Sequence, residues 1–399
     1  MSAAPEPTAA DLSLLRGKRV CIMQPALPRY RLSVFSMLAR RFEIDLTIAA
    51  EFRPIWGSLK SERGDGSFRT IDAPIRIIGP AFLQPSQVRL ASSGQFDAII
   101  YNWNRRFVHL GRALATARRR GVATVLWGHG FSKRESALRR WLRNQLIGKA
   151  DALLLYGHPA AATLAQEGFD PSRIFVAQNA IDHRPVDDAT ALWRSAAGKL
   201  AEFQRAKGLT DQQSVIFISR MEPDKRVSVL LDAFAILHRA APACRLILVG
   251  DGSDVPNLKA RARELGIDAA TIFTGPIYEE SQLAPWCLSA GVFAYPAAIG
   301  LSILHAFAYG LPVVTSDNIA AHNPEIESLA AGQNGLLAAD GDPASFAAQI
   351  NRILGGEADG FRTRARQTID RPGGFTIETM TNGFAAALCC ALRRHPPAR

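Results

Sequence analysis

The sequence predicts an α/β protein built from two Rossmann-like, doubly wound domains that face each other across a cleft. Its 399 residues amount to two domains, because ~100–200 residues per domain is usual. Apolar runs of strand length alternate with runs of helical pattern, which is typical of a mostly parallel sheet covered by helices. This alternation falters once, over residues 183–213, and then starts again.

The elements of the first half begin at Lys18, after residues 1–16, which are expected to be disordered or extended. A short apolar strand, a proline-rich turn, an amphipathic helix and a second strand account for residues 18–50. Further strands are expected at 96–103, 121–128 and 150–157, and helical patterns at 108–120 and 137–149 separate them. Residues 17–185 are therefore expected to form the first domain.

The second half repeats the alternation after residues 186–213, which are expected to be a linker that includes helix. The expected strands are 214–220, 244–252, 271–276, 292–296 and 311–317, and the expected helices are 227–242, 254–267, 280–291, 300–310 and 344–356. Residues 214–372 are expected to form the second domain. Residues 373–399 are expected to be a terminal helix that packs back on the first domain.

Composition and cysteine usage favour a globular protein of a reducing compartment. Hydrophobic residues make up 48% of the chain, which is ordinary for a protein with a sizeable core. The five cysteines show no metal-ligand spacing, and the one close pair, Cys389 and Cys390, is adjacent. No signal-peptide pattern is present, and no apolar run reaches the ~18 residues of a membrane-spanning helix. We therefore expect a cytoplasmic protein.

Positive charge is concentrated in one part of the chain. The net charge is +11, and residues 101–150 hold twelve Lys and Arg against the single acid Glu135, so the remainder is balanced. A local excess of this kind favours an anionic partner. Nucleic acid is not expected, because the basic block has little aromatic interleaving and no recognised binding module.

Within the basic block, residues 133–149 have the pattern of an amphipathic basic helix. Its apolar positions and the arginines between them are Leu138, Trp141, Leu142 and Leu146, with Arg139, Arg140 and Arg143. Such a helix can lie on an anionic membrane surface, which would place the protein peripherally on the inner face of the membrane. The alternative is an ordinary helix packed on its own sheet.

Two cations at a strand end form the first candidate site. Arg220 ends an apolar strand, and Lys225 follows in the loop before a helix. Ligands of open α/β sheets bind outside the carboxyl ends of the strands, so this pair could clamp a diphosphate. The alternative is that both are solvated surface cations.

Glycines mark two further strand ends. Gly250 and Gly252 follow a core strand, but the third glycine of a nicotinamide fingerprint is missing, so a tight turn is the plainer interpretation. Gly300 can take backbone angles closed to other residues, which would let a ligand approach the main chain.

The helix that follows Gly300 adds two kinds of group. Its first amides, at Leu301 and Ser302, would offer unpaired N–H groups to an anion. His305 lies one turn further along. A lone histidine in an apolar helix is more often a hydrogen-bonded core residue than a ligand.

Taken in order, these motifs resemble the family 4 glycosyltransferases of the GT-B fold. After the Arg and Lys come "VGDG", "FTGPI", a glycine turn and helix, "YGLPVVTSD", "NPEI" and "GQNGLL". The resemblance covers about residues 150–355 and includes "FVAQNAID" at 175–182. No single piece is specific, but so many in this order and spacing are a strong signal. The first half agrees in pattern only.

The resemblance implies that the second domain holds a nucleotide-sugar donor. The residues implied on this side are Arg220 and Lys225 at the diphosphate, Leu301 and Ser302 with their amides, Ile277 by the base, Glu325 in the proline-glutamate element, and Gly250, Gly300 and His305 around them. Transfer of a hexose-type sugar to a hydroxyl acceptor, with retention of the anomeric configuration, is the implied reaction. Family members lack a well-defined protein nucleophile, and none is nominated.

Two positions depart from the family pattern. The family often has a glutamate, seven residues and a second glutamate across this strand–helix turn, where this sequence has Ala297 and His305. The first usually faces the transferred sugar and the second the ribose hydroxyls. An imidazole can still hydrogen-bond a ribose hydroxyl, whereas the alanine side chain cannot accept a hydrogen bond.

In the first half, one histidine resembles a family residue. His129, between two glycines in "LWGHG", resembles the histidine that faces the transferring sugar; the alternative is a turn histidine bonded to backbone. Tyr30 and Arg31 replace a glycine-rich loop and are candidates for the acceptor. Asn102 and Asn104 end another strand on the same rim and could bind sugar hydroxyls.

The expected function is a retaining glycosyltransferase of bacterial polysaccharide or glycolipid synthesis, acting on a glycan or lipid-linked glycan. No His/Cys/Asp cluster with metal-ligand spacing is recognised in the sequence, so neither a metal nor a cofactor is expected. One alternative is a sugar-nucleotide epimerase of the same fold. A second alternative is a non-catalytic nucleotide-sugar or glycan-binding subunit, suggested by the missing glutamates.

Overall fold

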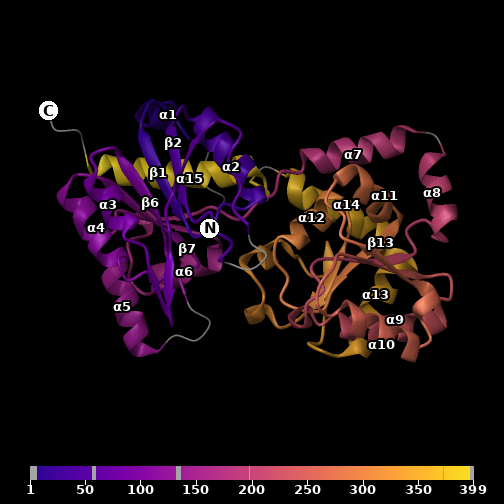
Figure 1. Cartoon of the computed structure of the whole chain (residues 1–399). Helices are drawn as coiled ribbons and strands as arrows, with labels where there is room; N and C mark the ends of the chain where they lie inside the picture. The colour runs from indigo at the N-terminus through magenta and orange to yellow at the C-terminus, as the bar shows by residue number, and fades with distance from the viewer. Residues whose placement is uncertain (1–6, 56–59, 132–135, 197, 372, 396–399) are drawn as a thin grey trace. The chain divides into compact units, whose positions relative to one another are not determined.

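The computed structural model describes residues 7–55, 60–131, 136–196, 198–371 and 373–395, and the chain divides into two compact units. Unit 1 comprises residues 1–182 and 376–399, and unit 2 comprises residues 183–375. In Figure 1, unit 1 runs from indigo to magenta and ends with the yellow C-terminal helix. Each unit is described below by itself.

Unit 1 is built on a seven-stranded parallel sheet with the strand order β3-β2-β1-β6-β7-β8-β9. Its strands are β1 (Arg19–Gln24), β2 (Asp45–Ala50), β3 (Arg69–Asp72), β6 (Ala98–Asn102), β7 (Ala123–Gly128), β8 (Ala152–Leu155) and β9 (Ile174–Val176), with β4 (Arg76–Ile78) and β5 (Ala81–Leu83) forming a separate antiparallel hairpin. Its helices are α1 (Ala9–Leu15), α2 (Arg29–Arg41), α3 (Ser86–Ser92), α4 (Leu110–Arg119), α5 (Ala137–Ile147), α6 (His158–Gln166) and α15 (Ile377–Arg393).

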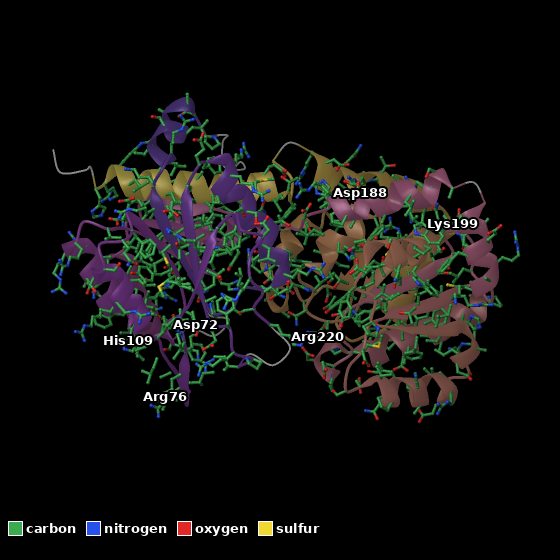
Figure 2. The ribbon with its side chains drawn as sticks, turned by 45° about the horizontal axis from the view of Figure 1, so that its top comes forward. Asp72, Arg76, His109, Asp188, Lys199 and Arg220 are labelled. Atoms are coloured by element: carbon green, nitrogen blue, oxygen red, sulfur yellow. The ribbon has the colours of Figure 1, made fainter. Side chains whose placement is uncertain are left out.

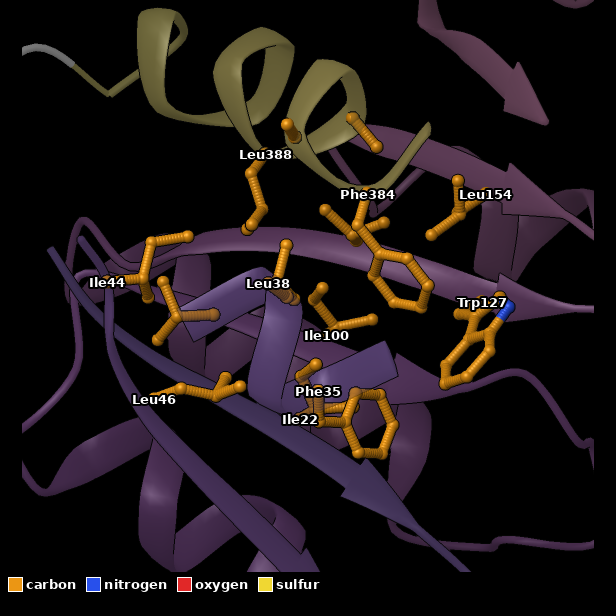
Figure 3. Packing of buried hydrophobic residues seen from close by; sticks show 14 of the residues in the cluster. Ile22, Phe35, Leu38, Ile44, Leu46, Ile100, Trp127, Leu154, Phe384 and Leu388 are labelled. Carbon is orange, nitrogen blue, oxygen red and sulfur yellow. The ribbon is translucent and has the colours of Figure 1, made fainter. Parts of the chain in front are cut away.

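Both faces of this sheet are buried. Along β1, Val20 and Ile22 belong to one core cluster and Cys21 and Met23 to the other, because successive side chains of a strand point to opposite faces. Helices α1, α2 and α15 cover the first face, and α3, α4 and α6 cover the second. Figure 3 shows the first cluster, where Phe384 of α15 packs near Trp127 of β7.

The C-terminal helix α15 is an integral part of unit 1. It packs along α2, as Figure 1 shows, and against β7, β8 and β9. At Gly383 a side chain would overlap the carbonyl oxygen of Val176 and stand 3.0 Å from Cα of Ala177. Glycine therefore lets the helix approach the end of β9 closely.

Unit 2 is built on a six-stranded parallel sheet with the order β12-β11-β10-β13-β14-β15. Its strands are β10 (Ser214–Ile218), β11 (Arg245–Val249), β12 (Thr271–Gly275), β13 (Ala290–Tyr295), β14 (Val313–Ser316) and β15 (Gly335–Ala338). Its α-helices are α7 (Arg184–Ser195), α8 (Lys199–Lys207), α9 (Val227–Ala240), α10 (Val255–Glu264), α11 (Glu280–Ser289), α12 (Ser302–Ala308), α13 (Pro343–Arg352) and α14 (Ala358–Asp370).

The segment expected as a linker, residues 186–213, is mostly helical and packs on unit 2. Helix α7 lies against α11, and the indole Nε1 of Trp193 donates to the carbonyl oxygen of Ser281 at 2.7 Å. The Phe203 ring of α8 meets the Trp286 ring of α11 edge to face, with centroids 4.9 Å apart. These two contacts attach α7 and α8 to α11 of unit 2.

The strand orders confirm the prediction of two doubly wound Rossmann-like sheets. In each unit the first strand lies beside the fourth, so the winding direction reverses between β1 and β6 and between β10 and β13. Loops that leave the carboxyl ends of these strands flank the switch point where ligands of this fold bind. Within the described part of the chain, no helix is both long enough and apolar enough to span a membrane.

Candidate functional site

In unit 2 the loops after β10 and β11 are joined through their backbones. The amide of Ser219 donates to Val249 O at 3.1 Å, and the amide of Met221 donates to Asp251 O at 2.8 Å. Gly250 has φ +138°, and a side chain there would overlap the carbonyl oxygen of Ser219. The glycine after β11 is therefore needed for close approach to the loop that carries Arg220.

Arg220 and Lys225 both belong to this loop after β10. Arg220 is exposed at the edge of unit 2, as Figure 2 shows. Lys225 ends a short 3-10 turn and is half-buried, and its Nζ contacts Oδ2 of the neighbouring Asp224 at 2.7 Å. The two cations thus lie five residues apart at the carboxyl edge of the sheet, on the β10 side of the switch point.

The loop after β13 lies on the other side of that switch point. The rings of Phe217 in β10 and Tyr295 in β13 stack with centroids 5.1 Å apart, and the hydroxyls of Ser219 and Tyr295 are 3.3 Å apart. These contacts join the start of the Arg220 loop to the start of the loop that contains Ala297 and Gly300. Ala297 itself is buried.

His322 holds the loop after β13 in place. Its Nδ1 accepts from the amide of Ile299 at 3.0 Å, and its Nε2 donates to the carbonyl oxygen of Ser316 at 2.8 Å. The next residue, Asn323, donates its amide to Ile299 O at 3.0 Å. The imidazole therefore bridges the ends of β13 and β14 below the candidate site.

Gly300 is required for a different reason from the one expected. Its φ is not positive, so the left-handed region is not used there. A side chain at this position would instead stand 2.9 Å from Nδ2 of Asn323. The explanation from backbone angles was therefore wrong, and close packing of Asn323 takes its place.

Helix α12 starts directly after this loop. Leu301 precedes it with helical angles (φ −54°, ψ −22°), and Ser302 is its first residue. The amide of Ile303 closes the first turn by donating to Gly300 O at 3.1 Å. Leu301 and Ser302 are half-buried. The helix has seven residues, so it is shorter than the sequence pattern indicated.

His305 contacts a carboxylate of unit 2 that also accepts a hydrogen bond from a phenol. Its Nε2 lies 3.0 Å from Oε1 of Glu280, whose Oε2 accepts from the Tyr309 hydroxyl at 2.5 Å. Burial raises the pKa of the Glu280 carboxyl, but the hydrogen bonds and charge of His305 and the bond from Tyr309 hold that pKa below its usual value. An ionised Glu280 makes Nε2 of His305 the donor, which leaves Nδ1 as the imidazole atom for any ligand.

Two further residues assigned to the donor side differ in accessibility. Ile277 lies in the loop after β12 and is half-buried. Glu325 lies in a 3-10 turn (Pro324–Ser328) and is only 4% exposed. Its side chain therefore contacts protein on nearly all sides, whereas Ile277 keeps some surface for a ligand.

In unit 1, His129 is presented by the two glycines around it. A side chain at Gly128 would stand 2.9 Å from the carbonyl oxygen of Trp103, and Gly130 has φ +78°. The exposed imidazole of His129 lies against the ring of Tyr156, with centroids 4.7 Å apart. The turn after β7 thus needs both glycines, one for space and one for its backbone angle.

Arg31 does not have the exposed position expected of an acceptor contact. It is 6% exposed, its Nη2 donates to Oδ1 of Asn179 at 2.8 Å, and its guanidinium lies 4.7 Å from the Trp127 ring. A buried cation needs such partners, so Arg31 supports the layer of rings beneath His129. Its neighbour Tyr30 is exposed.

A pocket of about 660 Å³ in unit 1 brings two of the predicted residues together. Asn104, after β6, and His129, after β7, both line it, together with Trp103, Arg105, Arg106, Phe131 and Arg143. Asn102 ends β6 and lies outside this lining. The loops at 103–106 after β6 and 129–131 after β7 therefore form one concave surface.

The basic helix α5 differs in part from the expected membrane-facing pattern. Trp141 and Leu142 are 57% and 45% exposed, and Leu146 packs on the core. Arg143, expected on the basic face, is 1% exposed, contacts Glu167 at 2.5 Å and lies over the Phe131 ring at 4.4 Å. Residues 133–135 and the side chains of Leu138 and Arg139 lie outside the described part of the chain.

Sequence reasoning missed three residues that shape the unit 2 site: Glu280, Tyr309 and His322. Glu280 follows "GPIYE" at a helix start, and Tyr309 lies four residues after His305. Their meeting near His305 depends on how α11 packs beside α12. His322 immediately precedes "NPEI", and that position was the one available signal.

The comparisons with known proteins agree with this architecture. Residues 212–355 match the family model described as glycosyl transferases group 1. A D-inositol 3-phosphate glycosyltransferase from Nocardioides sp. is 31% identical over 296 residues, which cover 68% of this chain and 59% of that protein. A D-inositol 3-phosphate glycosyltransferase from Frankia alni is 30% identical over 299 residues, which cover 68% of this chain and 69% of that protein. The structure of Anabaena HepE in complex with UDP matches with a TM-score of 0.68 at 17% identity, covering 93% of this chain and 99% of that one.

Two parallel sheets of this strand order are the GT-B fold. The chain belongs to the group 1 glycosyl transferase family. Across the first four curated relatives, it spans between about half and about two thirds of their own length.

Proposed function

We propose that this protein transfers a hexose-type sugar from a nucleoside diphosphate sugar to a hydroxyl acceptor, with retention of the anomeric configuration. The acceptor class would be a glycan or a lipid-linked glycan of bacterial polysaccharide or glycolipid synthesis. The observation that carries this proposal is the convergence of the Arg220–Lys225 loop and the loop at Gly300 on one switch point. Relatives named as glycosyltransferases and the UDP complex of HepE support it.

The chemistry follows from charge. The nucleoside diphosphate gains negative charge as it leaves the sugar, and groups fixed before the reaction can stabilise that charge by several kcal/mol. Arg220 offers a planar fork of donors and Lys225 a compact cation. We propose that these two side chains replace a metal ion in that role, so that chelation with EDTA leaves the transfer rate unchanged. A rate that falls with EDTA and recovers with a divalent cation would contradict this part.

Donor binding tests the site directly. The double variant Arg220→Ala/Lys225→Ala removes both cations, and its matched control Arg239→Ala/Arg263→Ala removes two exposed cations from α9 and α10 of the same unit. Each charge-assisted contact is worth about 1.5–3 kcal/mol, so the double variant should bind at least about 100-fold more weakly. The readout is the rise in melting temperature across a panel of nucleotide sugars. Equal stabilisation of the double variant and the wild type would contradict the assignment of Arg220 and Lys225 to the diphosphate site.

Product analysis separates the proposed reaction from the two alternatives. The buried methyl group of Ala297, at a position where the resemblance implies a glutamate, is the observation that favours a non-catalytic binding subunit. A transferase consumes donor only when acceptor is present and yields an acceptor extended by one sugar. An epimerase converts donor without acceptor, and a binding subunit leaves it unchanged.

We also propose peripheral contact with an anionic membrane through α5. The exposed Trp141 and Leu142 are the supporting observation, because an aromatic and an aliphatic side chain on a basic helix suit the headgroup region. Flotation with phosphatidylcholine vesicles, with and without phosphatidylglycerol, tests it. Binding that does not depend on acidic lipid, or that persists in Trp141→Ser/Leu142→Ser, would contradict it.

A further inference from the structure

We propose that the pocket of unit 1 beside His129 binds a phosphate group, and that this phosphate is carried by the acceptor. The second half of the statement rests on the proposed function, whereas the first half stands on the pocket alone. The ligand would be a phosphorylated sugar or polyol, or the phosphate of a lipid-linked acceptor. The chemistry that the pocket recognises is the same in both cases.

The walls of the pocket come from four segments of unit 1. They are the turn of the β4–β5 hairpin at Pro80 and Ala81, the loop 103–108 after β6, the loop 129–131 after β7, and Arg143 of α5. A volume of about 660 Å³ lies within the range of roughly 300–1,000 Å³ that is usual for small-molecule sites. The space therefore admits a sugar ring together with its phosphate.

The charge of the lining is positive. Three arginines contribute to it, Arg105, Arg106 and Arg143, and no carboxylate side chain is among the described residues that line the pocket. The charge of Arg143 is balanced by Glu167, which contacts it at 2.5 Å. Arg106, which lines the pocket from the loop after β6, has no ion pair with any described residue.

Arg106 is held in a fixed position. Its Nε donates to the carbonyl oxygen of Pro80 at 2.7 Å, and its guanidinium lies 3.9 Å above the Phe82 ring. Among the described residues, neither of its Nη groups has a hydrogen-bond partner, so both can serve a ligand. A guanidinium fixed in this way loses little freedom on binding, and its two Nη groups match the oxygens of a phosphate.

Asn104 adds a neutral donor beside Arg106. Its Oδ1 accepts from the backbone amide of Arg106 at 3.0 Å, which leaves its Nδ2 to donate to a ligand. The rings of Trp103 and Phe131 supply an apolar wall against which a sugar face can pack. The lining therefore combines phosphate donors with a surface for a sugar.

His129 connects the pocket to the proposed chemistry. Its exposed imidazole lines the same cavity as Arg106. An acceptor anchored by its phosphate at Arg106 would thus keep its remaining hydroxyls in the cavity that His129 lines. A phosphate anchor of this kind selects charged acceptors over neutral glycans.

The test uses NMR of the histidine Cε1–H groups in the full-length protein, titrated with inorganic phosphate. Because the donor site could also take phosphate, the readout is the His129 signal, assigned by its loss in His129→Gln. The His305 signal reports separately on unit 2. We expect a saturable shift of His129 in the wild type.

Three variants make the test specific. Arg106→Gln should raise the dissociation constant of phosphate, measured from the His129 signal, by about 10-fold or more, because a charge-assisted contact is lost. Arg106→Lys keeps the positive charge but not the two Nη donors. Its dissociation constant for phosphate should lie between those of Arg106→Gln and the wild type. Arg112→Gln removes an exposed arginine from the adjacent α4 and should leave the constant unchanged. A His129 signal that does not respond to phosphate, or an Arg106→Gln constant equal to that of the wild type, overturns the proposal.

Two further probes identify the source of the phosphate. A response of His129 to glucose 1-phosphate assigns the pocket to soluble sugar phosphates. A response only to micelles of short-chain phosphatidylglycerol, with none to short-chain phosphatidylcholine, assigns it to lipid phosphate. If neither probe competes with inorganic phosphate, the acceptor part is wrong. Because nucleotide-sugar binding is measured at unit 2, its failure would leave these results intact.

Discussion

At the scale of single residues, the Glu280–His305–Tyr309 cluster is the most distinctive feature of unit 2. The carboxylate of Glu280 joins the imidazole and the phenol through bonds of 3.0 and 2.5 Å. It thereby orients His305 at the position where the family resemblance implies a glutamate. A carboxylate is thus still present next to this position, but it comes from α11 and contacts the imidazole of His305.

The pH dependence of this cluster follows from Glu280. Its pKa lies below the ordinary 4.5 in the folded protein, so its contribution to stability is present above pH 4.5 and is lost as pH falls through the lower, folded value. Glu280→Gln should therefore cost about 2 kcal/mol at pH 7, and the difference from wild type should shrink in acid.

Urea unfolding at several pH values measures this difference. Glu279→Gln is the matched control, because Glu279 is the exposed neighbour at the start of α11. A Glu280→Gln deficit that stays constant down to acid pH would show that the carboxylate is not acting through its charge.

At the scale of elements, the loops of the candidate site are positioned by contacts between strand ends. The loops after β10 and β11 share backbone hydrogen bonds of 2.8 and 3.1 Å, and the glycine at 250 allows that approach. The loop after β13 is held by His322. Backbone hydrogen bonds on both sides of Arg220 thus fix its loop to the loop after β11, although its own side chain is exposed.

Gly250→Ala should disturb this arrangement strongly. The new methyl group would overlap Ser219 O and also face φ +138°, so we expect a loss of about 3 kcal/mol together with weaker donor binding. Gly266→Ala is the control, because Gly266 has φ +68° with open space around it and should cost only about 1 kcal/mol. Denaturation and nucleotide-sugar titration measure both effects. Equal losses of stability in the two variants would mean that the positive φ angle, and not the contact with Ser219, accounts for the effect.

At the scale of the whole molecule, the chain builds unit 1, then unit 2, and ends by completing unit 1. The Phe384 ring of α15 meets the Trp127 ring with centroids 4.7 Å apart and the Phe35 ring at 6.3 Å. The last helix therefore supplies part of the core beneath β7, the strand that leads to His129.

Phe384→Ala should destabilise unit 1 by about 3–5 kcal/mol, the usual cost of removing a buried phenylalanine. Its matched variant in unit 2 is Phe346→Ala, whose side chain is equally buried in α13. In calorimetry we expect two unfolding transitions, one lowered in temperature by Phe346→Ala and the other by Phe384→Ala. A nucleotide sugar should raise the melting temperature of the first transition and leave that of the second unchanged. A single transition shifted equally by both variants would contradict independent unfolding of the units.

Much of the architecture could be read from the pattern of residues. Strands of alternating or continuous apolar residues and helices of 3.6-residue period are local signals, so the two doubly wound sheets and the places of Arg220, Lys225, Asn104 and His129 at strand ends followed from them. Family membership followed from the order of short motifs.

What could not be read depends on packing between segments far apart in the chain. Burial of Arg31 by Asn179 and Trp127, inward rotation of Arg143 toward Glu167, and capture of His305 by Glu280 all join residues that no local period relates. The true reason for Gly300 is likewise a side chain more than twenty positions away, Asn323. Periodicity fixes which face of an element is buried, but the partner that a polar side chain finds is set by the tertiary fold.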